Sequence, residues 1–287
     1  MVLESITTPL KAEKKPWDLF FIGLLYSSVA MFLALWIFRE QASLVMVFLT
    51  VTATVPLMYN TLKFEEEKDS SITKESLLIK EHGKALLFFM FLFLGFLLAF
   101  SIWYVFLPEN TIEQTFHIQL QTIKSINSKV IGHSINSAST TSGVLLQIFS
   151  NNVKVFLFCI FFSFFYGAGA IFILTWNASV ISAAIGTFIR NNMSMYANSI
   201  GLTKVAGYFG VFSLGLLRYS IHGVPEILAY FIGGLAGGII SVAVIRHDFG
   251  SGHFKKILFD ALDLVVLGIF VLFIASLLEV FMTPLFF

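Results

Sequence analysis

Residues 85–107 read ALLFFMFLFLGFLLAFSIWYVFL, an apolar stretch without a single charged side chain. About 20 apolar residues in a helix are enough to cross the hydrocarbon core of a bilayer. Lipid offers no hydrogen bonds to the backbone, so an uninterrupted apolar segment of this length crosses as an α-helix. This stretch therefore predicts a transmembrane helix.

Comparable stretches recur on both sides of it. Full-length spans are predicted near 19–38, 42–62, 153–175, 222–245 and 257–281. The segment 202–217 is shorter and contains glycines, and the segment 178–189 is too short to cross on its own. The sequence thus predicts an all-α, polytopic transmembrane helical bundle of about seven spans, with 178–189 as a short re-entrant or half-helix segment. In an alternative arrangement, 178–189 merges with its neighbours into one irregular span and a different segment is re-entrant.

The composition excludes most other classes of protein. Of the 287 residues, 57% are hydrophobic and only 12% are charged, against about 45–50% and about 25% in ordinary globular chains. This much apolar surface excludes soluble, disordered, fibrous and nucleic-acid-binding proteins, so the lipid bilayer is the first expected partner. The chain contains one cysteine, so no disulfide forms within it.

The few basic residues predict how the chain is oriented. They gather in the N-terminal tail, in the polar segment 63–84 and in the loop 246–256, whereas the long polar segment 108–152 has few. Cytoplasmic loops of membrane proteins carry an excess of Lys and Arg. We therefore expect a multi-pass protein of the plasma membrane, with a cytoplasmic N-terminus and with 108–152 outside.

This division gives the chain three regions. Residues 1–62 form an N-terminal tail and a transmembrane hairpin. Residues 63–84 form a cytoplasmic charged helix or loop with the charge pattern of a solvated helix. Residues 85–287 form a membrane domain that includes the external polar segment 108–152.

Three polar residues recur at helical spacing in the C-terminal half of the chain. Arg218, His222 and Glu226 are four residues apart, so a continuous helix places them on one face. Charges at membrane depth are costly and often mark a functional site, and Pro225 interrupts the local backbone hydrogen bonding. This polar stripe is compatible with a proton relay, with a metal site that has a third ligand, or with structural hydrogen bonds. We expect no catalytic residue, cofactor or metal, because no phosphate-binding, hydrolase or Cys/His metal motif accompanies it.

Three asparagines complete the predicted intramembrane polar core. Asn151 and Asn152 stand at the start of the predicted helix 153–175, and Asn177 stands at its end. Amides in such positions cap helix ends or cross-link neighbouring helices. Glu279, near the end of the last predicted span, is expected to lie at the membrane interface.

Small residues predict where helices approach each other closely. Gly233, Gly234, Gly237 and Gly238 form two overlapping G-x-x-x-G patterns, and Gly167 lies in a similar stripe of small residues. Such patterns allow two helix backbones to come together inside a membrane. We interpret these glycines as helix-packing positions within the chain rather than as a homodimer face.

Several of these residues occur in a fixed order along the chain. The pair Asn151-Asn152 precedes the glycine-containing segment 165–169, which is followed by Asn177, and His222-Gly223-Val224-Pro225-Glu226 comes before a helix of small residues. This order resembles the stage II sporulation protein M family of integral membrane proteins. The resemblance covers about residues 74–284, and the hairpin 17–62 lies outside it.

The C-terminal sequence refines the resemblance. Leu107-Pro108, the segment 116–119 and the segment 276–284 look like a longer, archaeal branch of the family. In spore-forming bacteria the family resembles a scaffold component of the membrane complex that drives engulfment together with a cell-wall hydrolase. The resemblance therefore implies an integral membrane scaffold or assembly protein, with a membrane-protein partner or homo-oligomer and without catalysis of its own.

Two other functions remain open at this stage. An ion- or proton-coupled transporter or channel would use the Arg218–His222–Glu226 stripe, since discontinuous helices commonly frame substrate sites at mid-membrane. An intramembrane enzyme would use His222 and Glu226, but it needs a third catalytic group that the sequence does not identify.

Overall fold

The computed structural model describes residues 15–71, 75–125, 141–166, 169–193, 195, 201–245 and 252–283. Within these residues the chain is helical and contains no strand, which confirms the all-α class. Seven of the described helices are long and apolar enough to cross a membrane. They are α2 (Asp18–Ile37), α3 (Ala42–Ser71), α4 (Glu75–Phe106), α7 (Thr141–Tyr166), α8 (Ala170–Met193), α9 (Leu202–Ile245) and α10 (Gly252–Leu277).

Shorter elements connect or extend these helices. The 3₁₀ turn η2 (Arg39–Gln41) joins α2 to α3, and the short helix α5 (Glu109–Thr115) follows α4. The π-helical turn η4 (Leu278–Met282) continues α10. π-helical turns within α-helices often occur at functional sites.

The division of the chain between 153 and 193 differs from the sequence prediction. The predicted span 153–175 is split, because α7 ends at Tyr166 and α8 begins at Ala170. The segment 178–189 is therefore not a separate half-helix, and it lies inside the 24-residue α8, as in the alternative arrangement. The physical reason lies at Gly169, where a Cβ would collide with the backbone oxygen of Phe162. Hydropathy cannot reveal such a tight turn between two apolar helices.

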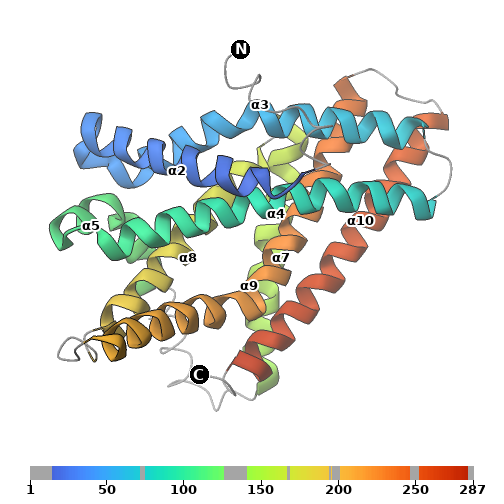
Figure 1. Ribbon diagram of the computed structural model, residues 1–287. Coiled ribbons are helices and arrows are strands. Elements are labelled where there is room, and N and C mark those ends of the chain that lie inside the picture. The colour runs from blue at the N-terminus through green and yellow to red at the C-terminus, as the bar shows by residue number, and fades with distance from the viewer. Residues whose placement is uncertain are drawn as a thin grey trace.

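The predicted segments 202–217 and 222–245 are one continuous helix. At a rise of about 1.5 Å per residue, the 44 residues of α9 extend to about 66 Å, roughly twice the thickness of the hydrocarbon core. Its two halves run in different directions (Figure 1), with Pro225 inside the helix. Proline removes one helical hydrogen bond and bends the axis. The second half is buried among other helices, whereas Leu202, Val205 and Phe209 of the first half are exposed.

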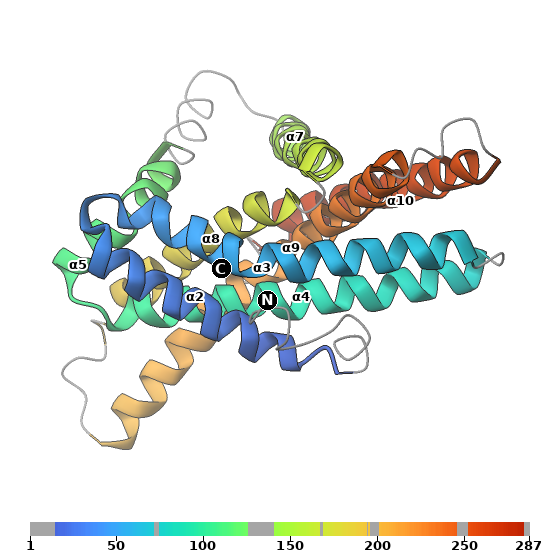
Figure 2. The same cartoon turned by 90° about the horizontal axis from the view of Figure 1, so that it is seen from above.

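The helices form two groups that meet at α8 and α9. In the first group α2 packs against both α3 and α4, and α8 lies against α4. In the second group α9 packs against α7 and α10. Figure 2 shows α7 nearly end-on while α3 and α4 run across the view, so α7 crosses them at a steep angle. The rings of Phe89 in α4 and Phe231 in α9 stack with centroids 5.4 Å apart and join the two groups.

Candidate functional site

The bend of α9 meets the end of α10 in a polar contact. His222 Nδ1 lies 3.1 Å from Thr283 Oγ1, directly after the π-helical turn. Tyr230 donates its hydroxyl hydrogen to Glu226 Oε1 at 2.6 Å. The carboxyl group of Glu279, inside the π-helical turn, lies within electrostatic range of Glu226. We call these five residues the α9–α10 polar contact.

Two members of this contact, Tyr230 and Thr283, were missed by sequence reasoning. Tyr230 follows Glu226 by one helical turn, so its spacing was a usable signal. Glu279 was expected at the interface, and Thr283 carried no signal, because the approach of α10 to the bend depends on the tertiary fold. An acidic residue close to the end of an apolar span was the clue that pointed to Glu279.

The predicted stripe Arg218–His222–Glu226 has different neighbours along its length. The guanidinium carbon of Arg218 lies 5.4 Å from the ring centroid of Phe188 in α8, which is a cation–π distance. His222 instead contacts Thr283 beyond the end of α10, and Glu226 accepts the hydrogen bond from Tyr230 of α9. Within the described part of the chain no hydrogen bond joins His222 to Glu226. The stripe therefore connects α9 to α8 at one end and to α10 at the other.

The asparagines lie in other places than the sequence predicts. Asn151 and Asn152 are inside α7 rather than at its start, and Asn177 is inside α8 rather than at a helix end. Asn151 is exposed, and Asn177 donates from Nδ2 to the carbonyl oxygen of Ile173 in its own helix at 2.9 Å. Asn152 is buried, and its Nδ2 has no hydrogen-bond partner among the described residues. These amides form no hydrogen bonds with the stripe in the described structure.

The glycines of α9 lie where other helices approach. A Cβ on Gly237 would collide with the backbone oxygen of Ile160 in α7, and a Cβ on Gly233 would lie 2.7 Å from the ring of Phe156. Real Cβ atoms do not come this close to their neighbours. The close packing of α7 against α9 therefore requires glycine at 233 and 237. The glycines thereby hold the second half of α9 deep in the fold.

The same helix approaches two further elements. A Cβ on Gly234 would lie 2.8 Å from Ala170 Cβ in α8, and a Cβ on Gly238 would lie 2.7 Å from the side chain of Leu62 in α3. Ser163 of α7 also donates its hydroxyl hydrogen to the carbonyl oxygen of Gly234 at 2.6 Å. Gly167, the fifth predicted packing glycine, lies outside the described residues.

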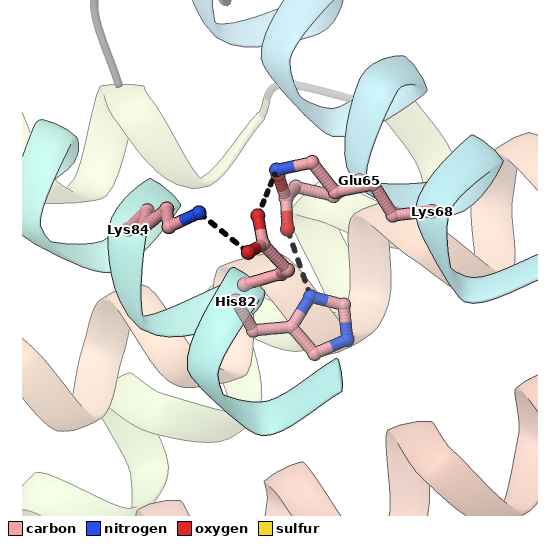
Figure 3. Close-up of polar contacts among 5 residues, drawn as sticks. Glu65, Lys68, His82 and Lys84 are labelled. Carbon is pink, nitrogen blue, oxygen red and sulfur yellow. Dashed lines mark hydrogen bonds and ion pairs between the residues drawn. The ribbon is translucent and has the colours of Figure 1, made fainter. Parts of the chain in front are cut away.

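A second polar cluster joins the ends of α3 and α4, and we call it the hairpin charge network (Figure 3). Glu65 is fully buried, with Oε1 at 2.8 Å from Lys68 Nζ and Oε2 at 2.9 Å from His82 Nδ1. Lys68 Nζ also lies 3.3 Å from Glu81 Oε2, and Lys84 forms an ion pair with the same carboxylate group. The sequence predicts a solvated charged segment here, but Glu65 and His82 are buried between the two helices. Burial without this pairing would be costly, so each charge needs its partners.

The family of the chain follows from comparison with known proteins. The family model described as Stage II sporulation protein M matches residues 84–284, which is more than half of the chain. The chain belongs to the stage II sporulation protein M family. This confirms the resemblance drawn from the ordered motifs. No curated protein and no solved structure matches the chain.

The matched range divides the structure of this stage II sporulation protein M family member. It includes the α9–α10 polar contact and all the predicted site residues. It begins inside α4 and leaves out α2 and α3. The hairpin charge network therefore links a helix outside the matched range to the first helix within it.

Proposed function

We propose that this protein is an integral membrane scaffold or assembly protein with no catalysis of its own. It holds a partner membrane protein, or further copies of itself, in the plasma membrane, and its N-terminus lies in the cytoplasm. Membership of the stage II sporulation protein M family supports the proposal, as do the helices long enough to span a membrane.

The observation that carries the proposal is the use of polar side chains to join helices. Besides the contact from Ser163 to Gly234, Ser182 of α8 donates to the carbonyl oxygen of Leu97 in α4 at 2.9 Å. Tyr104 and Thr187 link the same two helices at 2.8 Å. Interhelical hydrogen bonds in membranes contribute about 0.6 kcal/mol each on average. Together with the glycine contacts they join α4, α7, α8 and α9, and a fixed arrangement of helices is what a scaffold requires.

The partner surface that we assign is the outward face of α7. Only 17% of the residues in its most apolar stretch are buried within the chain, the lowest share among the seven candidate spans. Its C-terminal half exposes the large apolar side chains of Leu157, Phe158, Phe161 and Phe165, whereas polar residues such as Ser150 and Lys154 are exposed nearer its start. Lipid solvates a large apolar face as well as another helix does, so the face is assigned to a partner because α7 is the candidate span least covered by the rest of the chain.

The proposal is tested by measuring the mass of the purified complex in a mild detergent. We expect the full chain to elute with a partner protein or as a homo-oligomer, and we expect the double variant Leu157→Ala/Phe161→Ala to lose that association. The matched control is Leu262→Ala/Phe270→Ala, which truncates an equally exposed apolar face on α10. A native chain that remains a solitary monomer contradicts the proposal, and equal loss in both variants contradicts the assignment to α7.

Transport remains the less supported function. It requires a hydrated path beside Glu226. Among the described residues, a groove next to the bend is lined mainly by apolar side chains, and Glu226 does not line it. An intramembrane enzyme would need a third catalytic group beside His222 and Glu226. Among the described residues, His222 bonds to Thr283 across to the end of α10, and Glu226 bonds to Tyr230 within α9.

A further inference from the structure

The outward face of α7 is polar in its first half and apolar in its second. Gln147 and Lys154 are about two helical turns apart on one side of the helix. Ser150 and Asn151 lie between them on the same side, and all four side chains are exposed. We call these four residues the polar face of α7. It continues along the helix into the apolar partner surface assigned above.

The charge of Lys154 lies near the middle of a candidate span. α7 runs from Thr141 to Tyr166 and contains 26 residues, whereas about 20 residues are enough to cross the hydrocarbon core. Wherever a core of this thickness falls within α7, Lys154 is separated from its nearer edge by at least about 9 Å along the helix. Lysines near helix ends reach the interface, but Lys154 is far from both ends.

The described part of the chain offers Lys154 no counter-charge. No ion pair or hydrogen bond of its ammonium group is found among the described residues. Charged side chains inside membranes almost always face a partner or a water-filled cavity. Gln147, Ser150 and Asn151 add amide and hydroxyl groups that hydrocarbon cannot hydrogen-bond. The polar face therefore needs a covering that the described residues do not supply.

The chemistry of this covering follows from the two halves of the face. An ammonium group at membrane depth pairs with a carboxylate, and amides and hydroxyls form hydrogen bonds between neighbouring helices. The second half of the face, which includes Phe161 and Phe165, packs against apolar side chains. A transmembrane helix that carries one acidic residue in an apolar segment offers both along a single line, whereas lipid chains offer no hydrogen bonds.

Contacts with α10 fix the level of Lys154 in the molecule. The ring centroid of Phe149 in α7 lies 5.8 Å from that of Phe273 in α10. Further along α7, Phe156 lies against Gly268, where an added Cβ would collide with its ring. The two helices therefore run antiparallel, and Lys154 lies at a level between Gly268 and Phe273.

A second copy of this chain brings no exposed carboxylate of α10 to this level. Asp263 is exposed on α10 but precedes Gly268, so it lies about 7 Å or more from the level of Lys154. Glu279 follows Phe273 by a similar distance and belongs to the α9–α10 polar contact. Copies that share one orientation in the membrane keep each residue at the same depth. A carboxylate opposite Lys154 is therefore expected from a different protein.

We propose that the polar face of α7 binds a transmembrane helix of a different membrane protein, which presents an Asp or Glu carboxylate to Lys154. The ion pair sets the depth and the orientation of the partner, and the apolar half of the face packs against the rest of its helix. The ion pair rests on the proposed scaffold function, because it specifies the chemistry of the partner that this function requires.

A membrane-permeant carbodiimide tests the ion pair directly. Dicyclohexylcarbodiimide activates a carboxyl group inside the membrane, and the amine of Lys154 then displaces the urea and forms an amide with that carboxyl group. Native membranes are treated, the full chain is purified, and cross-linked peptides are sequenced by mass spectrometry. We expect the peptide that contains Lys154 to be joined to an Asp or Glu within an apolar segment of a different protein. Membranes with Lys154→Gln should lack this product.

Substitutions measure how much the partner depends on the charge. The amount of the cross-linked protein per chain is determined after purification of each variant in a mild detergent. Lys154→Gln should lower it at least about tenfold, because the partner's carboxylate is left unpaired. Lys154→Arg keeps the charge and should retain it within about twofold. The matched control is Lys63→Gln, which removes an exposed lysine of the polar segment 63–84 and should change nothing.

The outcomes separate the ion pair from the scaffold function. If Lys154→Gln retains the partner while Leu157→Ala/Phe161→Ala loses it, the ion pair is wrong and the scaffold function stands. A cross-link from Lys154 to a second copy of this chain also overturns the proposal. So does the absence of any cross-link in membranes from which the partner is recovered, since lipid headgroups or water then solvate the polar face. A native chain without any partner overturns both proposals.

Discussion

At the scale of single residues, the hairpin charge network illustrates how a charge is accommodated away from water. Glu65 has no exposed surface and contacts Lys68 and His82 through its two oxygens. Removing one member of a buried ion pair strands its partners, which typically costs more than the pair contributes. The individual residues were visible in the sequence. Their pairing across 17 positions was not, because it needs α3 and α4 to lie side by side.

Replacing Glu65 should therefore destabilise the protein strongly. We expect Glu65→Ala to lower the free energy of unfolding by about 3–5 kcal/mol, since Lys68 and His82 lose a shared partner. Lys84→Ala removes a member of the same network whose side chain is 43% exposed, and it should cost at most about 1 kcal/mol. Denaturant titration in mixed micelles measures both values. Equal effects of the two variants would show that burial is not what makes Glu65 important.

At the scale of helices, α2 and α4 cross with their backbones in contact. A Cβ on Gly95 of α4 would collide with the backbone oxygen of Phe20, and a Cβ on Gly23 of α2 would collide with that of Leu92. Gly95 lies within the apolar run 85–107, so a close approach there was foreseeable. Its partner was not foreseeable, because any of the other helices could supply the facing glycine.

A larger side chain at this crossing should separate the two helices. We expect Gly95→Leu to destabilise the fold by about 1–3 kcal/mol or more, because backbone atoms cannot move aside as flexible side chains do. Gly83→Leu is the control, since it lies in the same helix and an added Cβ there meets nothing within 4 Å. Thermal unfolding of the detergent-solubilised chain compares them. The crossing is refuted as a packing constraint if Gly95→Leu melts no lower than Gly83→Leu.

At the scale of the whole molecule, seven candidate spans follow one another along the described chain. An odd number of crossings places the two ends of the chain on opposite sides of the membrane. The sequence also predicts seven crossings, but it counts 202–217 and 222–245 as separate spans and 178–189 as re-entrant. In the structure, α8 is a full-length helix and α9 is a single bent one, so the number of candidate spans is again seven. The orientation predicted from the basic loops is therefore compatible with either division.

Labelling from one side of the membrane tests this orientation. The single native cysteine, Cys159, is buried, so an added surface cysteine dominates the reaction with a membrane-impermeant maleimide. We expect Glu113→Cys in α5 to react in intact cells and Lys63→Cys in α3 to react only after lysis, because basic segments stay in the cytoplasm. Both positions are exposed. The reverse pattern would invert the proposed topology.

The sequence by itself determined the helical membrane class, the number of candidate spans and the family. These depend on the length of apolar runs and on the need to satisfy backbone hydrogen bonds in lipid, which are local properties. Only the tertiary structure decided that the chain turns at Gly169 and that α9 continues through Pro225. It also decided that His222 meets Thr283 after the end of α10 while Arg218 meets Phe188 of α8. Such contacts join residues far apart in the chain, and they form only when whole helices have packed against one another.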